Sequence, residues 1–176
     1  LGMGMPTPSA YILAAALMAP ILTKLGISTM GAHMFVLYYA VMSALTPPVA
    51  VAAYAASSIA EDNPLYIALL AVKFALAAFI IPFAFIFGPE LLMNGAPMEI
   101  LVSLVSAVVG LIIIAAAAEG YFTEPLSAPI RLILVAAGLT LVAPNSIASG
   151  IGFVLGSVTL GPAVYRRFIS RSSDLS

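Results

Sequence analysis

The sequence predicts an all-α integral membrane protein, and three observations support this fold class. The 176 residues are 63% hydrophobic and 7% charged, with a mean hydropathy of +1.18. Asp, Glu, Lys and Arg are absent from four long stretches, residues 25–60, 74–89, 100–118 and 132–165. A membrane-spanning helix needs about 20 apolar residues, which such stretches supply. Proline-centred breaks also interrupt the apolar sequence, as in a multi-span bundle with irregular backbone inside it.

Composition excludes several other classes of protein. A soluble domain would need a charged exterior that this sequence cannot supply. The net charge of −1, with no basic run before the C-terminus, argues against a nucleic-acid surface. Cysteine is absent, which excludes disulfides and cysteine metal sites. We find no Ser/His/Asp set, no pair of intramembrane carboxylates and no metal-spaced cluster, so we expect neither an enzyme nor a cofactor.

The first helix is expected from about Pro8 to Leu22, closed by Lys24, Gly26 and Ser28. About 15 residues rise only ~23 Å, less than the ~30 Å of the hydrocarbon core. A helix this short suits one arm of a re-entrant hairpin better than a full span. Because the chain opens with Leu inside a Gly/Pro motif, with no signal peptide, we expect a C-terminal fragment of a longer protein.

The second element, residues 31–60, is too long for one straight crossing, since 30 helical residues would reach ~45 Å. Pro47 and Pro48 divide it, because proline lacks the N–H of a helical residue and clashes with the preceding turn. We therefore predict a discontinuous helix with halves at about 31–45 and 49–60, followed by a loop at Glu61–Pro64.

Four further spans are expected, at about 65–87, 98–118, 128–143 and 147–165, with a tight turn at Pro144–Ser146. The last span is rich in glycine, at positions 150, 152, 156 and 161, which predicts close packing on a neighbouring helix. A C-terminal arginine cluster predicts a cytoplasmic C-terminus by the positive-inside rule. Its members are Arg166, Arg167 and Arg171.

Two proline-centred breaks, at Gly2–Thr7 and Ser43–Pro48, carry the candidate ion and substrate site. Each break also has an ordinary structural interpretation. The first could be a turn between two spans, and the second could be a kink that neighbouring helices stabilise. Broken helices at membrane depth are, however, where secondary transporters commonly bind ions and substrates. Thr46 offers a hydroxyl and a carbonyl freed by the prolines, both suited to Na⁺. The candidate residues are Gly2, Gly4, Pro6, Thr7, Ser43, Thr46, Pro47 and Pro48.

Other polar residues in the spans fit ordinary roles. Lys73 is the one charge away from the ends of a span, but it lies near enough to Pro64 for its side chain to reach the cytoplasmic interface. His33 is the single histidine and fits an interfacial position better than a metal site or proton relay. The side chains of Tyr38, Tyr39 and Tyr54 fit packing and substrate contact equally well.

The residues of both breaks resemble the large membrane subunit of the TRAP (tripartite ATP-independent periplasmic) transporters. The resemblance rests on LGMGMPTPSAY at residues 1–11 and SALTPPVA at residues 43–50. Ala19-Pro20, Leu25-Gly26-Ile27 and Ile81-Pro82-Phe83 also fit, especially the variant with fused small and large subunits. It is specific over residues 1–93, which would form the C-terminal part of the transport domain. Residues 94–176 resemble the extra C-terminal helices, with a cytoplasmic tail, of some fused members.

The resemblance implies half of an inverted-repeat, elevator-type carrier in the bacterial inner membrane. Such a carrier would import an organic anion, a carboxylate, from a periplasmic substrate-binding protein, driven by a sodium gradient or alternatively by protons. The small membrane subunit would be fused upstream, and the Gly2–Thr7 and Ser43–Pro48 segments would match the second-repeat hairpin tip and broken helix. Two alternatives remain open: a carrier of the same superfamily that needs no binding protein, and a non-transporting membrane scaffold.

Overall fold

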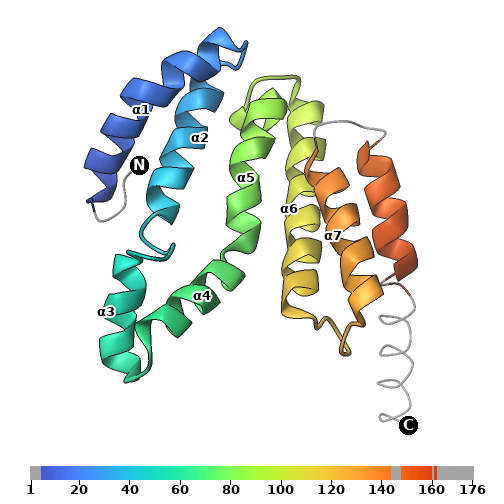
Figure 1. Cartoon of the computed structure of the whole chain (residues 1–176). Coiled ribbons are helices and arrows are strands. Elements are labelled where there is room, and N and C mark those ends of the chain that lie inside the picture. The colour runs from blue at the N-terminus through green and yellow to red at the C-terminus, as the bar shows by residue number, and fades with distance from the viewer. Residues whose placement is uncertain (1–4, 144–147, 160, 162–176) are drawn as a thin grey trace. The chain divides into compact units, whose positions relative to one another are not determined.

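The computed structural model describes residues 5–143, 148–159 and 161, and helices joined by short irregular segments make up this part of the chain (Figure 1). They contain no β-strand, only one isolated bridge between Tyr121 and Pro125, so the predicted all-α class is confirmed. The chain divides into two compact units, Leu1–Asn94 and Gly95–Ser176. The first unit contains α1 (Thr7–Lys24), α2 (Thr29–Met42), α3 (Val51–Ala60), α4 (Pro64–Phe74), α5 (Leu76–Phe87) and the 3₁₀ helix η1 (Pro89–Leu92). The second contains α6 (Pro97–Glu119), α7 (Ala128–Val142) and the helix Ala148–Thr159.

The first two helices form an antiparallel hairpin, joined by a short turn in which Gly26 has a φ of 90°. The Ser28 side chain accepts a hydrogen bond from the Gly31 amide at 3.1 Å, which caps the start of α2. Small side chains let the two helices approach closely. The buried residues of α1 and α2 are Ala10, Ala15, Ala19, Gly31, Ala32, Val36 and Ala40. The predicted first helix is confirmed to within two residues at either end.

The discontinuous helix is also confirmed, with a wider break than predicted. We expected the first half to reach residue 45, but α2 ends at Met42. The Ala44 and Leu45 amides instead bond to the carbonyls three residues earlier, of Val41 and Met42. The chain therefore tightens before it reaches the prolines, and it resumes α-helical geometry only at Val51.

The third span, predicted over residues 65–87, consists of two helices with a bend between them, which the sequence did not predict. Helices α4 and α5 meet at Ala75 with a bend of 45°. Neither proline nor glycine lies at this position, so the local sequence does not explain the bend. Helix α4 packs on α3, whereas α5 packs on α2. Helices α2 and α3 run in different directions on either side of the break at residues 43–50. Because α4 lies along α3 and α5 lies along α2, α4 and α5 must also differ in direction.

Of the described helices, α6 alone is long and apolar enough to cross a membrane unbroken, with 23 residues and a hydropathy of 2.9. The bent pair α4–α5 makes a second span if it is counted as one. Helix α7 and the helix Ala148–Thr159 are apolar but shorter. The predicted turn at Pro144–Ser146 lies outside the described residues. The arginines of the C-terminal cluster, Arg166, Arg167 and Arg171, also lie outside them.

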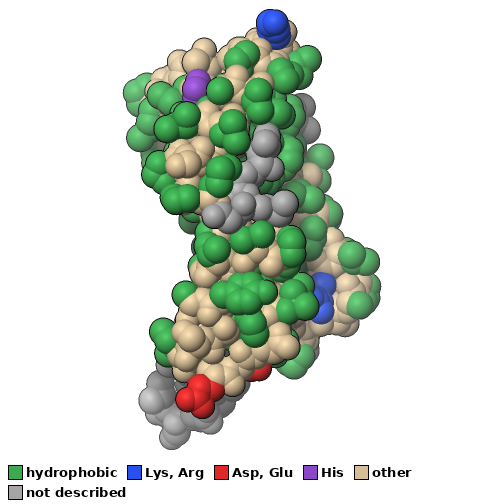
Figure 2. Space-filling model, turned by 60° about the vertical axis from the view of Figure 1, so that its left-hand side comes forward, with side chains coloured by type: hydrophobic (Ala, Val, Ile, Leu, Met, Phe, Trp, Pro, Cys, Tyr) green, Lys and Arg blue, Asp and Glu red, His purple; other side chains and the backbone are tan. Residues whose placement is uncertain are grey.

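Apolar side chains are exposed on the surface, as expected for contact with lipid. Figure 2 shows hydrophobic side chains spread over the face in view, with few charged ones among them. On α6 the exposed residues include Leu101, Val105, Val108 and Ile112, each about half exposed. Their spacing of three or four residues places them in one stripe along the helix.

Close backbone contact joins the helices of the second unit. A Cβ added to Gly110 would lie 2.8 Å from the Gly138 carbonyl oxygen, and one added to Gly138 would lie 2.8 Å from that of Gly110. The buried Ser106 hydroxyl donates to the Leu141 carbonyl at 2.7 Å. In the glycine-rich helix, Gly152 lies against α7, since a Cβ there would approach the Ala137 carbonyl to 2.7 Å. The predicted close packing of that helix is confirmed at this glycine.

We predict that Gly138→Ala destabilises the protein by about 1–3 kcal/mol, because the added methyl has no room between α6 and α7. Gly150→Ala is the matched control, since no described atom lies within 4 Å of its Cβ position. The control should be neutral or slightly stabilising, because alanine favours helix by up to about 1 kcal/mol over glycine. The measurement is the unfolding midpoint of the full-length protein in detergent. Equal midpoints for the two variants would contradict the predicted contact.

Candidate functional site

The break between α2 and α3 follows from the two backbone donors that its prolines lack. Pro48 cannot donate to the Ala44 carbonyl, as a helical residue there would. That carbonyl accepts a hydrogen bond from the Ala52 amide at 3.1 Å instead, so the chain folds back across the break. This hydrogen bond makes the loop a defined backbone structure rather than a frayed helix end. The Pro47–Pro48 peptide bond is cis.

Thr46 lies at the centre of the break and is half-buried. Its hydroxyl donates to the Met42 carbonyl at 2.8 Å. Its own carbonyl accepts from the Ala50 amide at 3.1 Å, so our expectation that the prolines free this carbonyl was wrong. The reason is that a helical carbonyl pairs with the amide four residues later, so the donors that Pro47 and Pro48 lack would serve the carbonyls of residues 43 and 44, while Thr46 keeps its ordinary partner, Ala50. Both oxygens retain lone pairs, so both can still ligate a cation.

Ser43 ends α2, and its side chain bonds to the same helix. The hydroxyl donates to the Ala40 carbonyl at 2.7 Å, and the Ser43 amide donates to the Tyr39 carbonyl at 3.1 Å. Hydroxyls that bond back to the preceding turn compete with the backbone ladder and bend helices. Ser43 and Thr46 therefore both help α2 to end where it does.

Several backbone carbonyls of the break have no partner. In the described part of the chain, no hydrogen bond reaches the carbonyl oxygens of Leu45, Pro47 or Pro48. An unsatisfied carbonyl in hydrocarbon costs several kcal/mol, so such backbone persists only inside protein or beside water. Among the described residues, the break therefore has more backbone acceptors than donors.

The end of the break is strained at Ala50. This residue has a φ of 37° and a ψ of 49°, in the left-handed region, and it is 1% exposed. A non-glycine residue in this conformation costs about 1–2 kcal/mol. It packs in a small cluster with Ala53 and Ala68, which fixes α3 against α4. Strained backbone of this kind is often found at functional sites, where the surrounding structure holds it in place.

The other candidate segment lies at the start of α1. Pro6 precedes the helix and Thr7 is its first residue, while the Pro6 carbonyl accepts from the Ala10 amide at 3.0 Å. Gly2 and Gly4 lie outside the described residues. Because α1 and α2 are antiparallel, the start of α1 lies at the same end of the hairpin as the break after Met42 (Figure 1).

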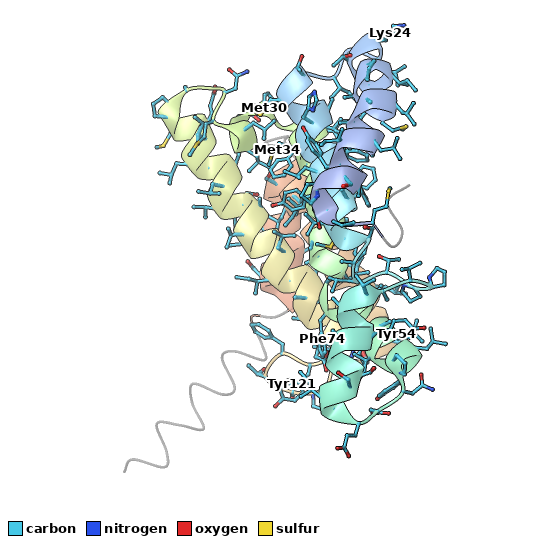
Figure 3. The ribbon with its side chains drawn as sticks, turned by 90° about the vertical axis from the view of Figure 1, so that its left-hand side faces the viewer. Lys24, Met30, Met34, Tyr54, Phe74 and Tyr121 are labelled. Atoms are coloured by element: carbon cyan, nitrogen blue, oxygen red, sulfur yellow. The ribbon has the colours of Figure 1, made fainter. Side chains whose placement is uncertain are left out.

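The remaining polar residues of the first unit take up specific positions. Lys73 is exposed at the end of α4, beside the bend, with its ammonium 6.0 Å from the centre of the Phe74 ring. The Tyr11 hydroxyl lies 2.8 Å from Nδ1 of His33, which links α1 to α2. In Figure 3, Lys24 lies at the opposite end of the first unit from Tyr54 and Phe74. Within the described residues no group of three or more His, Cys, Asp or Glu could hold a metal ion.

Sequence reasoning missed three features of this region. Ala50 gave no signal, because alanine rarely adopts a positive φ. The bend at Ala75 gave none either, because packing rather than local chemistry produces it. The Tyr39 hydroxyl, which bonds to the Phe79 carbonyl, could have been noticed from its position one helical turn before Ser43.

Taken together, the apolar helices and the proline-broken helix are those of a helical membrane protein. Residues 1–100 match the family described as the Tripartite ATP-independent periplasmic transporter, DctM component. The chain belongs to this family, as its resemblance to TRAP large subunits predicted, and it is a membrane component of a transporter. No curated protein and no solved structure matches the chain.

We predict that Ala50→Gly changes stability little or raises it, by up to about 1 kcal/mol, because glycine adopts positive φ without strain. Ala53→Gly removes the same methyl from the same buried cluster, but from regular helix, and should cost about 1 kcal/mol or more. The check is the unfolding midpoint of both variants in detergent. A loss at Ala50 as large as that at Ala53 would show that the left-handed conformation is not strained.

Proposed function

We propose that this chain forms the site-bearing part of a secondary active transporter that imports organic anions, coupled to a sodium gradient. The substrate class is carboxylates, delivered by a periplasmic binding protein. The single observation that carries the proposal is the break between α2 and α3, with unpaired carbonyls in an apolar chain of a TRAP transporter family. An unpaired acceptor in hydrocarbon is stable only when protein, water or an ion compensates for it.

The cation site in this proposal is built around Thr46. Its hydroxyl oxygen and the carbonyl oxygens of Leu45, Pro47 and Pro48 belong to one short loop. Backbone carbonyls replace the hydration shell of alkali cations in other membrane proteins. Ser43, directly after α2, is the first residue of this loop and is proposed to belong to the site. Pro6 and Thr7, at the start of α1, lie at the same end of the α1–α2 hairpin and are proposed to belong to it too. Gly2 and Gly4 are proposed to contribute backbone to the same site.

The remaining parts of the transporter are proposed from the family. They are a periplasmic binding protein and a small membrane subunit, fused upstream of this chain. The transporter is placed in the bacterial inner membrane with the C-terminus in the cytoplasm, since Arg166, Arg167 and Arg171 favour that side. Protons are the alternative coupling ion.

The transport test uses the full-length protein in proteoliposomes with its purified binding protein. Uptake of ¹⁴C-labelled organic acids, for example succinate, glutamate and pyruvate, is measured under an imposed sodium gradient, an imposed pH gradient or neither. Sodium-driven uptake that requires the binding protein is the expected result. Uptake without the binding protein would favour the independent carrier, and no uptake of any acid under either gradient would favour the scaffold.

We predict that Thr46→Val raises the half-saturating sodium concentration about tenfold or more, equivalent to 1.4 kcal/mol of binding energy. Valine keeps the shape of threonine but has no hydroxyl oxygen to ligate the ion. Thr46→Ser keeps the hydroxyl and should retain most activity. The measurement is initial uptake rate against sodium concentration.

The control for this prediction is Ser57→Ala. The Ser57 hydroxyl also donates to a carbonyl of its own helix, that of Tyr54 at 2.7 Å, but it lies in α3 beyond the break. Its removal should leave the sodium dependence unchanged. If Thr46→Val folds normally and has the sodium dependence of Ser57→Ala, the hydroxyl is not a ligand.

A further inference from the structure

The Tyr39 side chain connects the two broken helices of the first unit. Its hydroxyl donates to the backbone carbonyl of Phe79 at 3.0 Å, from α2 across to α5. Its ring lies 6.2 Å from that of Phe79 and 6.3 Å from that of Phe83, measured between centroids. Tyr39 is half-buried in this contact.

This hydrogen bond lies within one turn of both breaks. Tyr39 precedes the end of α2, at Met42, by three residues, and Phe79 follows the start of α5, at Leu76, by three residues. The two helices run antiparallel, so the α2–α3 break and the α4–α5 bend lie at the same level of the unit (Figure 1). A bond at this position fixes the distance between the two irregular segments.

The acceptor is a carbonyl within helix α5. A backbone carbonyl in a helix has a second lone pair, and at Phe79 a hydroxyl from α2 uses it. In an apolar interior the Tyr39 hydroxyl also needs an acceptor. Each group therefore satisfies the other.

The backbone of Tyr39 also contacts the break. Its carbonyl accepts a hydrogen bond from the amide of Ser43, which is the last residue before the loop. The side chain of Tyr39 therefore bonds to α5, and its backbone bonds to the end of α2. Phe35 supports this position, since its ring lies 4.9 Å from that of Tyr39 and 5.3 Å from that of Phe83.

We propose that Tyr39 is a positioning residue for the cation site at Ser43–Pro48, acting through the bond of its hydroxyl to the Phe79 carbonyl. This inference rests on the proposed function. The hydroxyl does not touch the ion in this proposal; it holds the end of α2 against α5, so that the oxygens of the break keep their spacing. Sodium affinity therefore depends on a group that lies one helical turn from the site.

The test compares Tyr39→Phe with Tyr38→Phe in the full-length transporter, purified in detergent. Both changes remove one hydroxyl from the same turn of α2. Tyr38 also packs edge-on against an aromatic ring of α5, that of Phe85 at 5.4 Å, but no hydrogen bond of its hydroxyl is found in the described part of the chain. Equilibrium binding of ²²Na⁺ gives the sodium affinity. Thermal unfolding in choline chloride gives the stability without the ion.

We expect Tyr39→Phe to weaken ²²Na⁺ binding about fivefold, the effect of losing one intramolecular hydrogen bond. Tyr38→Phe should bind sodium like the wild type, and the two variants should unfold in choline within a few degrees of each other. A Tyr39→Phe protein with wild-type sodium affinity would overturn the proposal, as would equal losses of affinity in both variants.

A further outcome separates this inference from the proposed function. If the wild type binds no ²²Na⁺, the positioning role and the sodium site both fail. Uptake of an organic acid under a pH gradient would then still establish transport. If the wild type binds sodium and only the Tyr39 result is negative, the cation site stands and its positioning by Tyr39 does not.

Discussion

The rest of the first unit depends on the backbone donors missing at Pro47 and Pro48. In a water-filled environment their loss would cost little, because water would replace them. In an apolar chain each carbonyl left behind must find another donor or remain unsatisfied. The Ala44 carbonyl, whose helical donor would be at position 48, finds its donor in Ala52 instead, and this requires the chain to turn back on itself. The left-handed conformation of Ala50 is part of that turn.

The bend in the next span is a consequence of the same break. Helix α3 leaves the break in a new direction, and α4 returns along it because Ala53 and Ala68 leave room for close packing. Helix α5 has a different partner, α2, to which it is fixed by the rings of Phe35, Tyr39 and Phe83. The chain changes partner at Ala75, and there it bends by 45°. Both irregular segments of the unit therefore lie where the chain changes its packing partner.

The sequence was informative where the cause is local. Proline chemistry predicted the discontinuous helix, and the spacing of small residues predicted the contact at Gly152. It was uninformative where the cause lies in tertiary packing, as at Ala75, or where an unfavourable conformation is imposed on an ordinary residue, as at Ala50. The Ala44 carbonyl shows a third limit. The position of Pro48 predicts that the helical donor of this carbonyl is missing, but it does not predict that the Ala52 amide replaces that donor.

The two units use their polar groups differently, and this contrast supports placing the site in the first. In the second unit the hydroxyl of Ser106 bonds to the Leu141 carbonyl across a helix contact. The Arg131 guanidinium donates to the carbonyls of Ala117 and Ala118, which end α6. Donors there serve acceptors that the helices leave open. At the α2–α3 break acceptors outnumber donors among the described residues, and this excess supports the cation site that we propose there.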